Sequence, residues 1–211
     1  MSAAGSAADS PLDWAVLARP RHGQTVSGDA GVVKLVSGGA MVAAIDGLGH
    51  GAAAATAAGI AATIVSRSDD RDVQSLMTRC HEELRGTRGA AITLAWLSFS
   101  ACTMTWVALG DVEGRLLSAQ RGEHRGRALR LPGGVAGHDQ PTLAPETVEI
   151  HRGDVIVLAT DGVDGIFADA LELVGAAHEI AERVLDAHWS GMDDGLAIDL
   201  RWLLDGGQRA A

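Results

Sequence analysis

The chain has 211 residues, a length that favours a single domain. It carries 17 Lys plus Arg and 27 Asp plus Glu, so its formal net charge is −10, and this charge argues against nucleic acid or an anionic membrane as a partner. Its two cysteines, Cys80 and Cys102, form no Cys-x-x-Cys pair, which argues against a disulfide framework and against a sulfur-ligated zinc site.

The predicted strands begin after residues 1–11, an Ala/Ser/Gly-rich stretch that we expect to be a disordered lead-in. This stretch lacks the basic start and apolar core of a signal peptide. Gly, Asp or Arg interrupts each apolar run well before the length of a membrane span, so we expect a cytoplasmic protein. Short apolar runs rich in β-branched residues predict strands at 12–18, 32–36, 41–45, 90–98, 102–109, 115–119, 148–150, 155–159 and 196–202.

Three stretches have the composition and periodicity of helices, namely residues 52–65, 70–85 and 168–187. Two of them are consecutive, so the chain lacks the strict strand–helix alternation of a doubly wound parallel sheet. We therefore expect an α+β fold in which two packed, mostly antiparallel sheets are flanked by helices. One domain would cover residues 12–204, and residues 205–211 would form a flexible tail.

Two Asp-Gly pairs, Asp46-Gly47 and Asp161-Gly162, follow apolar runs that are predicted strands. Such a carboxylate can aim oxygen atoms into a cleft, and a glycine after it lets the backbone turn. Asp29 and Asp193 also lie at the edges of predicted strands. A cluster of aspartates repels itself, and divalent cations relieve part of that repulsion. These four acids therefore predict one site for hard metal ions.

Several short motifs occur in an order that resembles the metal-dependent protein phosphatases of the PPM (type 2C) superfamily. The resemblance is to the SpoIIE-like branch and within it to the RsbX-like group of small serine phosphatases, and it covers nearly the whole chain. Each motif alone is a common turn sequence, and the indication comes from their order. They are Ser27-Gly28-Asp29, Asp46-Gly47-Leu48-Gly49-His50-Gly51, Gly86-Thr87-Arg88-Gly89, Gly110-Asp111-Val112-Glu113, Gly133-Gly134-Val135-Ala136-Gly137, Gly153-Asp154, Ala159-Thr160-Asp161-Gly162 and Asp193-Asp194.

The resemblance implies a PPM-type β-sandwich and a site for two Mn²⁺ or Mg²⁺ ions. Such ions bind phosphoryl oxygens and activate a bridging water for hydrolysis of a phosphate monoester. Asp46 would bridge both ions, and the carbonyl of Gly47 would bind one of them. Asp161 and Asp193 would bind the ion nearer the end of the chain, while Asp29 acts on the other. Asp194 would either support a ligand or replace Asp193 as one.

Two further residues have open alternatives. Some relatives carry a histidine two residues after the bridging aspartate, as a general acid. His50 lies four residues after Asp46, so it is either that catalyst or a cap of the helix that begins near Ala52. Arg88 either contacts phosphate or is a surface or salt-bridged arginine.

The function implied by the resemblance is hydrolysis of phosphoserine or phosphothreonine on STAS-domain proteins of a stress-response sigma-factor pathway. The partner would be a phosphorylated stressosome scaffold or a free anti-anti-sigma factor. One alternative is a catalytically inactive pseudophosphatase that binds partners, although all the metal-site carboxylates are retained. Another is a dinucleotide-binding enzyme, because Gly47-Leu48-Gly49-His50-Gly51-Ala52 satisfies Gly-x-Gly-x-x-Ala before a helix.

Overall fold

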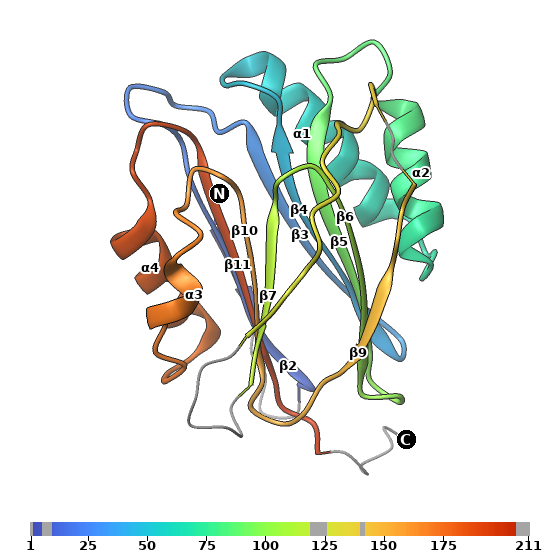
Figure 1. Ribbon diagram of the computed structural model, residues 1–211, viewed down its shortest axis with the longest axis vertical. Coiled ribbons are helices and arrows are strands. Elements are labelled where there is room, and N and C mark those ends of the chain that lie inside the picture. The colour runs from blue at the N-terminus through green and yellow to red at the C-terminus, as the bar shows by residue number, and fades with distance from the viewer. Residues whose placement is uncertain (1, 6–9, 119–125, 140–141, 206–211) are drawn as a thin grey trace.

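The computed structural model describes residues 2–5, 10–118, 126–139 and 142–205, and in it two β-sheets pack face to face between two layers of helices (Figure 1). All strand pairings among these residues are antiparallel. The first sheet has the order β1 (Ser2–Gly5), β2 (Leu12–Arg19), β11 (Gly195–Trp202), β10 (Val155–Ala159), β7 (Glu113–Leu117) and β8 (Arg127–Ala128). The second sheet has the order β3 (Asp29–Val36), β4 (Gly39–Gly47), β5 (Ala90–Ser98), β6 (Thr103–Leu109) and β9 (Glu146–Glu149).

This architecture confirms the predicted α+β fold of two antiparallel sheets flanked by helices. It also shows that the dinucleotide-binding alternative is wrong. That alternative needs a strand that leads through a helix into a parallel neighbour. β4 instead lies between β3 and β5, and both pairings are antiparallel.

The helices form one layer on the outer face of each sheet (Figure 1). α1 (Ala52–Arg67) and α2 (Val73–Glu83) cover the five-stranded sheet, and α3 (Phe167–Ala170) and α4 (Ala177–His188) cover the six-stranded sheet. β4 illustrates why its sequence is a continuous apolar run. Val42 and Ala44 point into the core between the sheets, while Ala43 and Ile45 point toward α1 and α2. A strand that is buried on both faces has no polar alternation.

The third predicted helix is broken into two, because residues 171–176 leave the helical conformation. Gly175 has a φ of 104°, which a helix does not allow, and the Ala176 N–H is bonded by the Glu179 carboxylate at 2.9 Å to start α4. The sequence prediction missed this break, and it also missed β8, which is only two residues long.

The N-terminus differs from the predicted lead-in. Ser2–Gly5 form β1, which pairs with the edge of β2, so the prediction of disorder is wrong for these four residues. Their small side chains carry no apolar pattern, and the pairing depends on backbone hydrogen bonds that composition does not encode. Residues 1 and 6–9 of the lead-in, and residues 206–211 of the predicted tail, lie outside the described residues. Among the described residues, no helix is long and apolar enough to cross a membrane.

Candidate metal centre

The four predicted metal-site aspartates come from both sheets and meet at one end of the sandwich. Asp29 is the first residue of β3, and it is paired with Asp46 directly across the β3–β4 ladder. Asp161 lies two residues after β10, and Asp193 lies two residues before β11. Like charges in directly opposite positions destabilise a sheet. A cation bound between Asp29 and Asp46 would offset this repulsion.

Both glycines of the Asp-Gly pairs are needed for close backbone approach. A Cβ on Gly47 would overlap the carbonyl of Ala54 in α1, and a Cβ on Gly162 would overlap the carbonyl of Asp194. Neither glycine is among the residues with positive φ, and Gly47 still belongs to β4. The expected sharp turn is therefore not their role. Gly47 lets α1 pack against the end of β4 that carries Asp46, and Gly162 lets the 193–194 segment pack against the loop that carries Asp161.

Thr160 connects the two sheets beneath the cluster. Its buried hydroxyl donates to Asp29 Oδ2 at 2.7 Å and accepts from the Leu196 N–H at 2.9 Å. Because Thr160 Oγ1 accepts the Leu196 N–H, the hydroxyl proton of Thr160 points toward Asp29. The sequence analysis placed Thr160 in a motif but assigned it no role.

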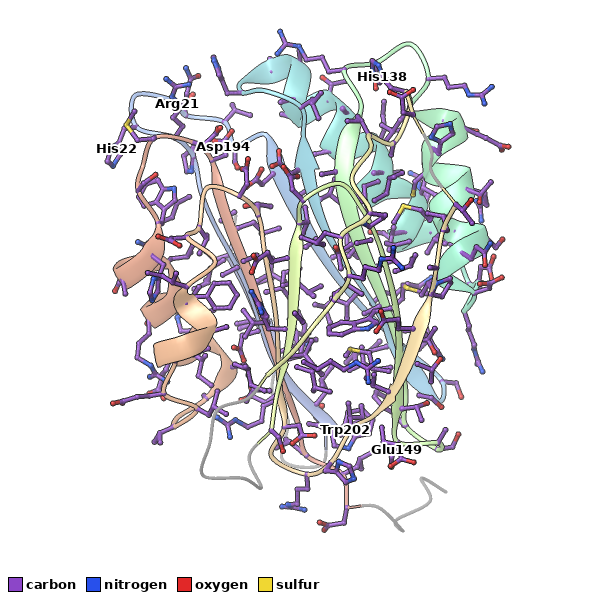
Figure 2. All side chains as sticks on the ribbon, in the orientation of Figure 1. Arg21, His22, His138, Glu149, Asp194 and Trp202 are labelled. Carbon is purple, nitrogen blue, oxygen red and sulfur yellow. The ribbon has the colours of Figure 1, made fainter. Side chains whose placement is uncertain are left out.

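Asp194 differs from Asp193 in how its oxygens are used. Its buried carboxylate accepts from the Arg21 N–H and from the Gly28 N–H, both at 2.8 Å, and so anchors the loop before β3. Figure 2 shows Asp194 and Arg21 together at this end of the sandwich, with Trp202 at the opposite end. Asp193 is only partly buried, and one of its oxygens accepts from the Asp194 N–H at 2.9 Å. The other Asp193 oxygen has more freedom to bind a ligand.

The carboxyl groups perturb one another strongly. Burial, followed by the charges of Asp29 and Asp161, raises the pKa of Asp46 to about 9. Burial also raises the pKa of Asp29 to about 7, although the Thr160 hydrogen bond opposes this rise. The pKa of Asp161 is raised as well, chiefly by loss of water around its carboxyl group. A hydrogen bond between Asp46 and Asp161 adds to the rise in the pKa of Asp46 and opposes the rise in the pKa of Asp161.

Asp111 is an acid of this cluster that the sequence analysis did not include among the site residues. It lies between β6 and β7, and its charge raises the pKa of both Asp46 and Asp161. The sequence analysis included Asp111 in the motif Gly110-Asp111-Val112-Glu113 but assigned it no role. Its effect depends on the distance to β4 and β10, which only the fold sets.

These residues fit a divalent cation by their chemistry. Among the described residues, no three His, Cys, Asp or Glu side chains already form a tight group around one point. The donors that meet here are nevertheless all oxygens, which is the set that Mg²⁺ and Mn²⁺ prefer. The charge of such an ion would also relieve the mutual repulsion that, after burial, contributes to the three raised pKa values.

His50 is exposed in the loop between β4 and α1. The N-cap residue of α1 is Gly51, and no side-chain hydrogen bond caps the helix. The structure therefore does not support the helix-cap alternative. The catalytic alternative stays a prediction.

Arg88 is exposed and lies over the same loop. One of its terminal nitrogens would be 2.6 Å from a Cβ placed on Gly49, so the guanidinium reaches the backbone that follows Asp46. The Leu48 N–H bonds the Gly89 carbonyl at 3.0 Å and holds the two loops together. No ion pair between described residues includes Arg88, which argues against the salt-bridged alternative.

The family model described as Stage II sporulation protein E (SpoIIE) matches residues 37–202 of the chain. The chain belongs to the SpoIIE family. It is 25% identical over 144 residues to the phosphoserine phosphatase RsbX of Bacillus subtilis (strain 168), an alignment that covers 68% of this chain and 71% of that protein.

Two solved structures are also similar. One was described in work on the bacterial stressosome as a modular system adapted to control secondary messenger signalling. It has a TM-score of 0.82 and 28% identity, covering 91% of this chain and 100% of the other. The second is RsbX in complex with magnesium, with a TM-score of 0.84 and 21% identity over 96% of this chain and 100% of the other.

The family match and these relatives confirm the predicted recognition and enzyme class. This SpoIIE-family chain is a protein serine/threonine phosphatase with the PPM-type fold.

Proposed function

We propose that this phosphatase removes phosphate from phosphoserine or phosphothreonine of STAS-domain proteins in a stress-response sigma-factor pathway. The observation that carries the proposal is the convergence of Asp29, Asp46, Asp161 and Asp193 from two sheets at one end of the fold. The substrate class rests on the similarity to RsbX and to a structure from stressosome work. A phosphorylated stressosome scaffold or a free anti-anti-sigma factor, in the cytoplasm, is the proposed partner.

The proposed ligand set holds two Mn²⁺ or Mg²⁺ ions. Asp46 would hold both ions and the carbonyl of Gly47 one of them, Asp161 and Asp193 would hold the ion nearer the C-terminal segment, and Asp29 would act on the other. When bound, such ions neutralise phosphoryl oxygens and lower the pKa of a bound water. Asp194 is a supporting residue in this proposal, because both of its oxygens already accept backbone N–H bonds.

Two exposed residues complete the proposed site. His50 lies four residues after Asp46, in the loop before α1, and in this proposal its imidazole donates a proton to the leaving serine oxygen. Arg88 lies over Gly49 of the same loop, where its guanidinium can bind a phosphate oxygen.

The direct test compares Asp46→Asn with the wild-type enzyme on p-nitrophenyl phosphate, with Mn²⁺ and with EDTA. Loss of a bridging carboxylate removes several kcal/mol of transition-state stabilisation. We therefore expect kcat/KM to fall by at least about 10³-fold. Asp69→Asn is the matched control, since Asp69 is an exposed carboxylate in the connection between α1 and α2. Activity that survives either Asp46→Asn or EDTA would rule out the assignment.

The substrate class needs a second test. Purified phosphorylated STAS proteins, one from a stressosome and one free anti-anti-sigma factor, are incubated with the enzyme, and phosphate release is measured. Faster turnover of either than of an unrelated phosphoserine protein supports the proposal. Tight binding of a STAS protein without any phosphate release would favour the pseudophosphatase alternative.

A further inference from the structure

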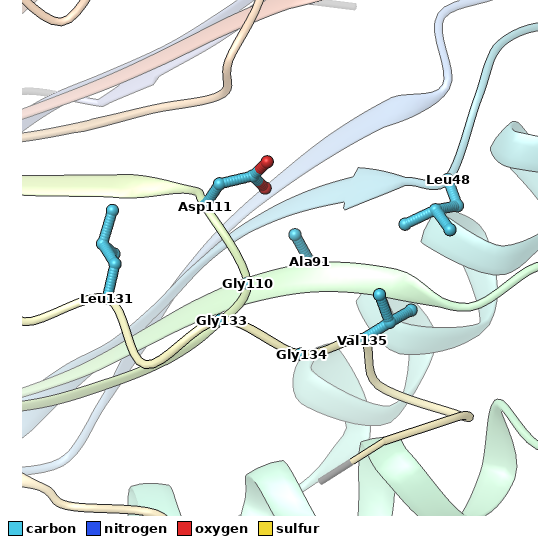
Figure 3. A pocket seen from close by; sticks show the side chains of 8 residues that line it. All are labelled: Leu48, Ala91, Gly110, Asp111, Leu131, Gly133, Gly134 and Val135. Atoms are coloured by element: carbon cyan, nitrogen blue, oxygen red, sulfur yellow. The ribbon is translucent and has the colours of Figure 1, made fainter. Parts of the chain in front are cut away.

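A groove of about 310 Å³ lies next to the acidic cluster, between the loop after β4 and the segment that follows β8 (Figure 3). The side chains of Leu48, Leu131 and Val135 line it, and Ala91 and Gly133 contribute to its floor. Among the described residues that line the groove, Asp111 alone is charged. The groove is therefore apolar except at the edge where Asp111 faces the cluster.

The floor of the groove is built from tightly packed backbone. Gly110 donates to the Gly133 carbonyl at 3.2 Å, and a Cβ on Gly110 would overlap Ala91. Gly133 has a φ of 75°, and a Cβ placed there would meet no atom within 4 Å. The glycines thus bring the two segments together and leave the space above them open.

The rim of the groove exposes aliphatic side chains. Leu48 is 41% exposed and Leu131 is 37% exposed. Exposed apolar side chains that line a concavity beside a polar site commonly mark the contact surface of a ligand or protein. None of the described residues that line the groove is basic, so the lining itself does not attract a second phosphate or an acidic residue.

The groove is continuous with the proposed reaction site. Leu48 directly follows Asp46-Gly47, and Asp111 acts electrostatically on both Asp46 and Asp161. A phosphoserine whose phosphate lies at the cluster must therefore place residues of its own chain next to the groove.

We infer that this groove binds an aliphatic side chain close in sequence to the phosphorylated residue of a protein substrate, and so contributes to substrate selection. The inference rests on the proposed function. The occupant is a segment of the phosphoprotein, because only a chain anchored at the cluster brings an apolar group to a groove that opens beside it. Asp111 at the shared edge would repel an acidic neighbour in the same position.

The experiment uses phosphoserine peptides in which one Leu is moved through the three positions on each side of the phosphoserine in an otherwise alanine–serine host. We expect one position to raise kcat/KM by about tenfold over the Leu-free peptide, as burial of an aliphatic group in a pocket gives. Asp at that position should lower kcat/KM below that of the Leu-free peptide. With Leu131→Asp, the ratio of Leu-peptide to Leu-free kcat/KM should fall to within about twofold of one.

Leu35→Asp is the matched control, because Leu35 is a leucine of similar exposure, 47%, near the far end of β3. It should keep the full Leu preference. p-Nitrophenyl phosphate, which has no neighbouring residues, measures the chemistry alone and verifies that each variant is folded and active. A preference that survives Leu131→Asp, or no preference at any position while p-nitrophenyl phosphate is hydrolysed, overturns the inference and leaves the proposed function intact.

Two other results also decide the matter. If the wild-type enzyme with Mn²⁺ hydrolyses neither p-nitrophenyl phosphate nor any peptide, the proposed function itself fails, and this inference fails with it. If sedimentation shows a dimer that Leu131→Asp dissociates and Leu35→Asp does not, the groove belongs to a contact between copies of the chain, and the substrate assignment is wrong.

Discussion

Thr160 joins the two sheets by hydrogen bonds at the carboxylate of Asp29. Its hydroxyl donates to Asp29 and accepts from the Leu196 N–H, so it links β3 to β11 at the base of the cluster. A hydrogen bond to a ligand from a neighbouring side chain fixes the orientation of that ligand. Thr160 is therefore a positioning residue for Asp29 in the proposed metal site.

Thr160→Val keeps the shape of the side chain and removes the hydroxyl. We expect Mn²⁺ affinity, measured by calorimetry, to fall by about 10- to 100-fold. The buried Leu196 N–H also loses its partner, which should lower the free energy of unfolding by about 1–3 kcal/mol. Thr160→Ser keeps the hydroxyl and should bind Mn²⁺ almost as the wild-type protein does. Equal Mn²⁺ affinity in the Val and Ser variants would contradict a positioning role.

The contact between β4 and α1 lies directly beside Asp46, near the end of β4. Ala54, Ala57, Ala58, Ala61 and Val65 form the buried face of α1, and small residues there let the helix lie close to the strand. Gly47 allows the closest approach, to the Ala54 carbonyl. The Ala-rich composition of α1 thus has a packing role as well as a high helix propensity.

Two glycine-to-alanine substitutions, one on the exposed side of α1 and one at its contact with β4, should have opposite effects on stability. Gly59 is exposed in the middle of α1 with open space around it, so Gly59→Ala should raise the free energy of unfolding by about 0.5–1 kcal/mol. Gly47→Ala should lower it by about 1–3 kcal/mol, because the methyl group meets backbone that cannot move aside easily. Urea denaturation measures both. Stabilisation by Gly47→Ala would show that α1 does not pack on β4 as described.

Stability should depend on pH through the acidic cluster. An unfolded aspartate ionises near 3.8, whereas the pKa is raised to about 7 for Asp29 and to about 9 for Asp46. Between these values the folded protein binds more protons than the unfolded chain, so its free energy of unfolding falls as pH rises. In EDTA, we expect the urea midpoint to decline from about pH 4 to about pH 9.

Asp46→Asn should remove the part of this decline nearest pH 9, and an unchanged slope in that variant would contradict the high pKa of Asp46. Mn²⁺ competes with protons for the same oxygens, so its affinity should rise over the same pH range. Calorimetry at pH 6 and at pH 8.5 measures that rise. An affinity that does not change with pH would mean that the cluster is ionised without the metal.

Several features followed from local patterns in the sequence. The apolar runs predicted most strands, since a strand buried on one or both faces shows a period of two or no polar positions. The motif order predicted the family and the two-sheet fold. It also placed Asp29, Asp46, Asp161 and Asp193 at strand ends, where the structure brings them together, although their roles as ligands remain proposals.

Other features depend on contacts between segments that are far apart in the chain, and no local pattern encodes them. The break before α4 depends on the single φ of Gly175, and β1 exists because β2 offers an open edge. The glycine of each Asp-Gly pair serves close packing where a turn was expected. Local periodicity in the sequence was enough to predict most strands and helices, and the order of short motifs was enough to predict the family. The fold alone decided that Asp111 reaches the cluster, that Thr160 holds Asp29 and that Asp194 anchors a loop, because charge interactions and hydrogen bonds depend on distances across the two sheets.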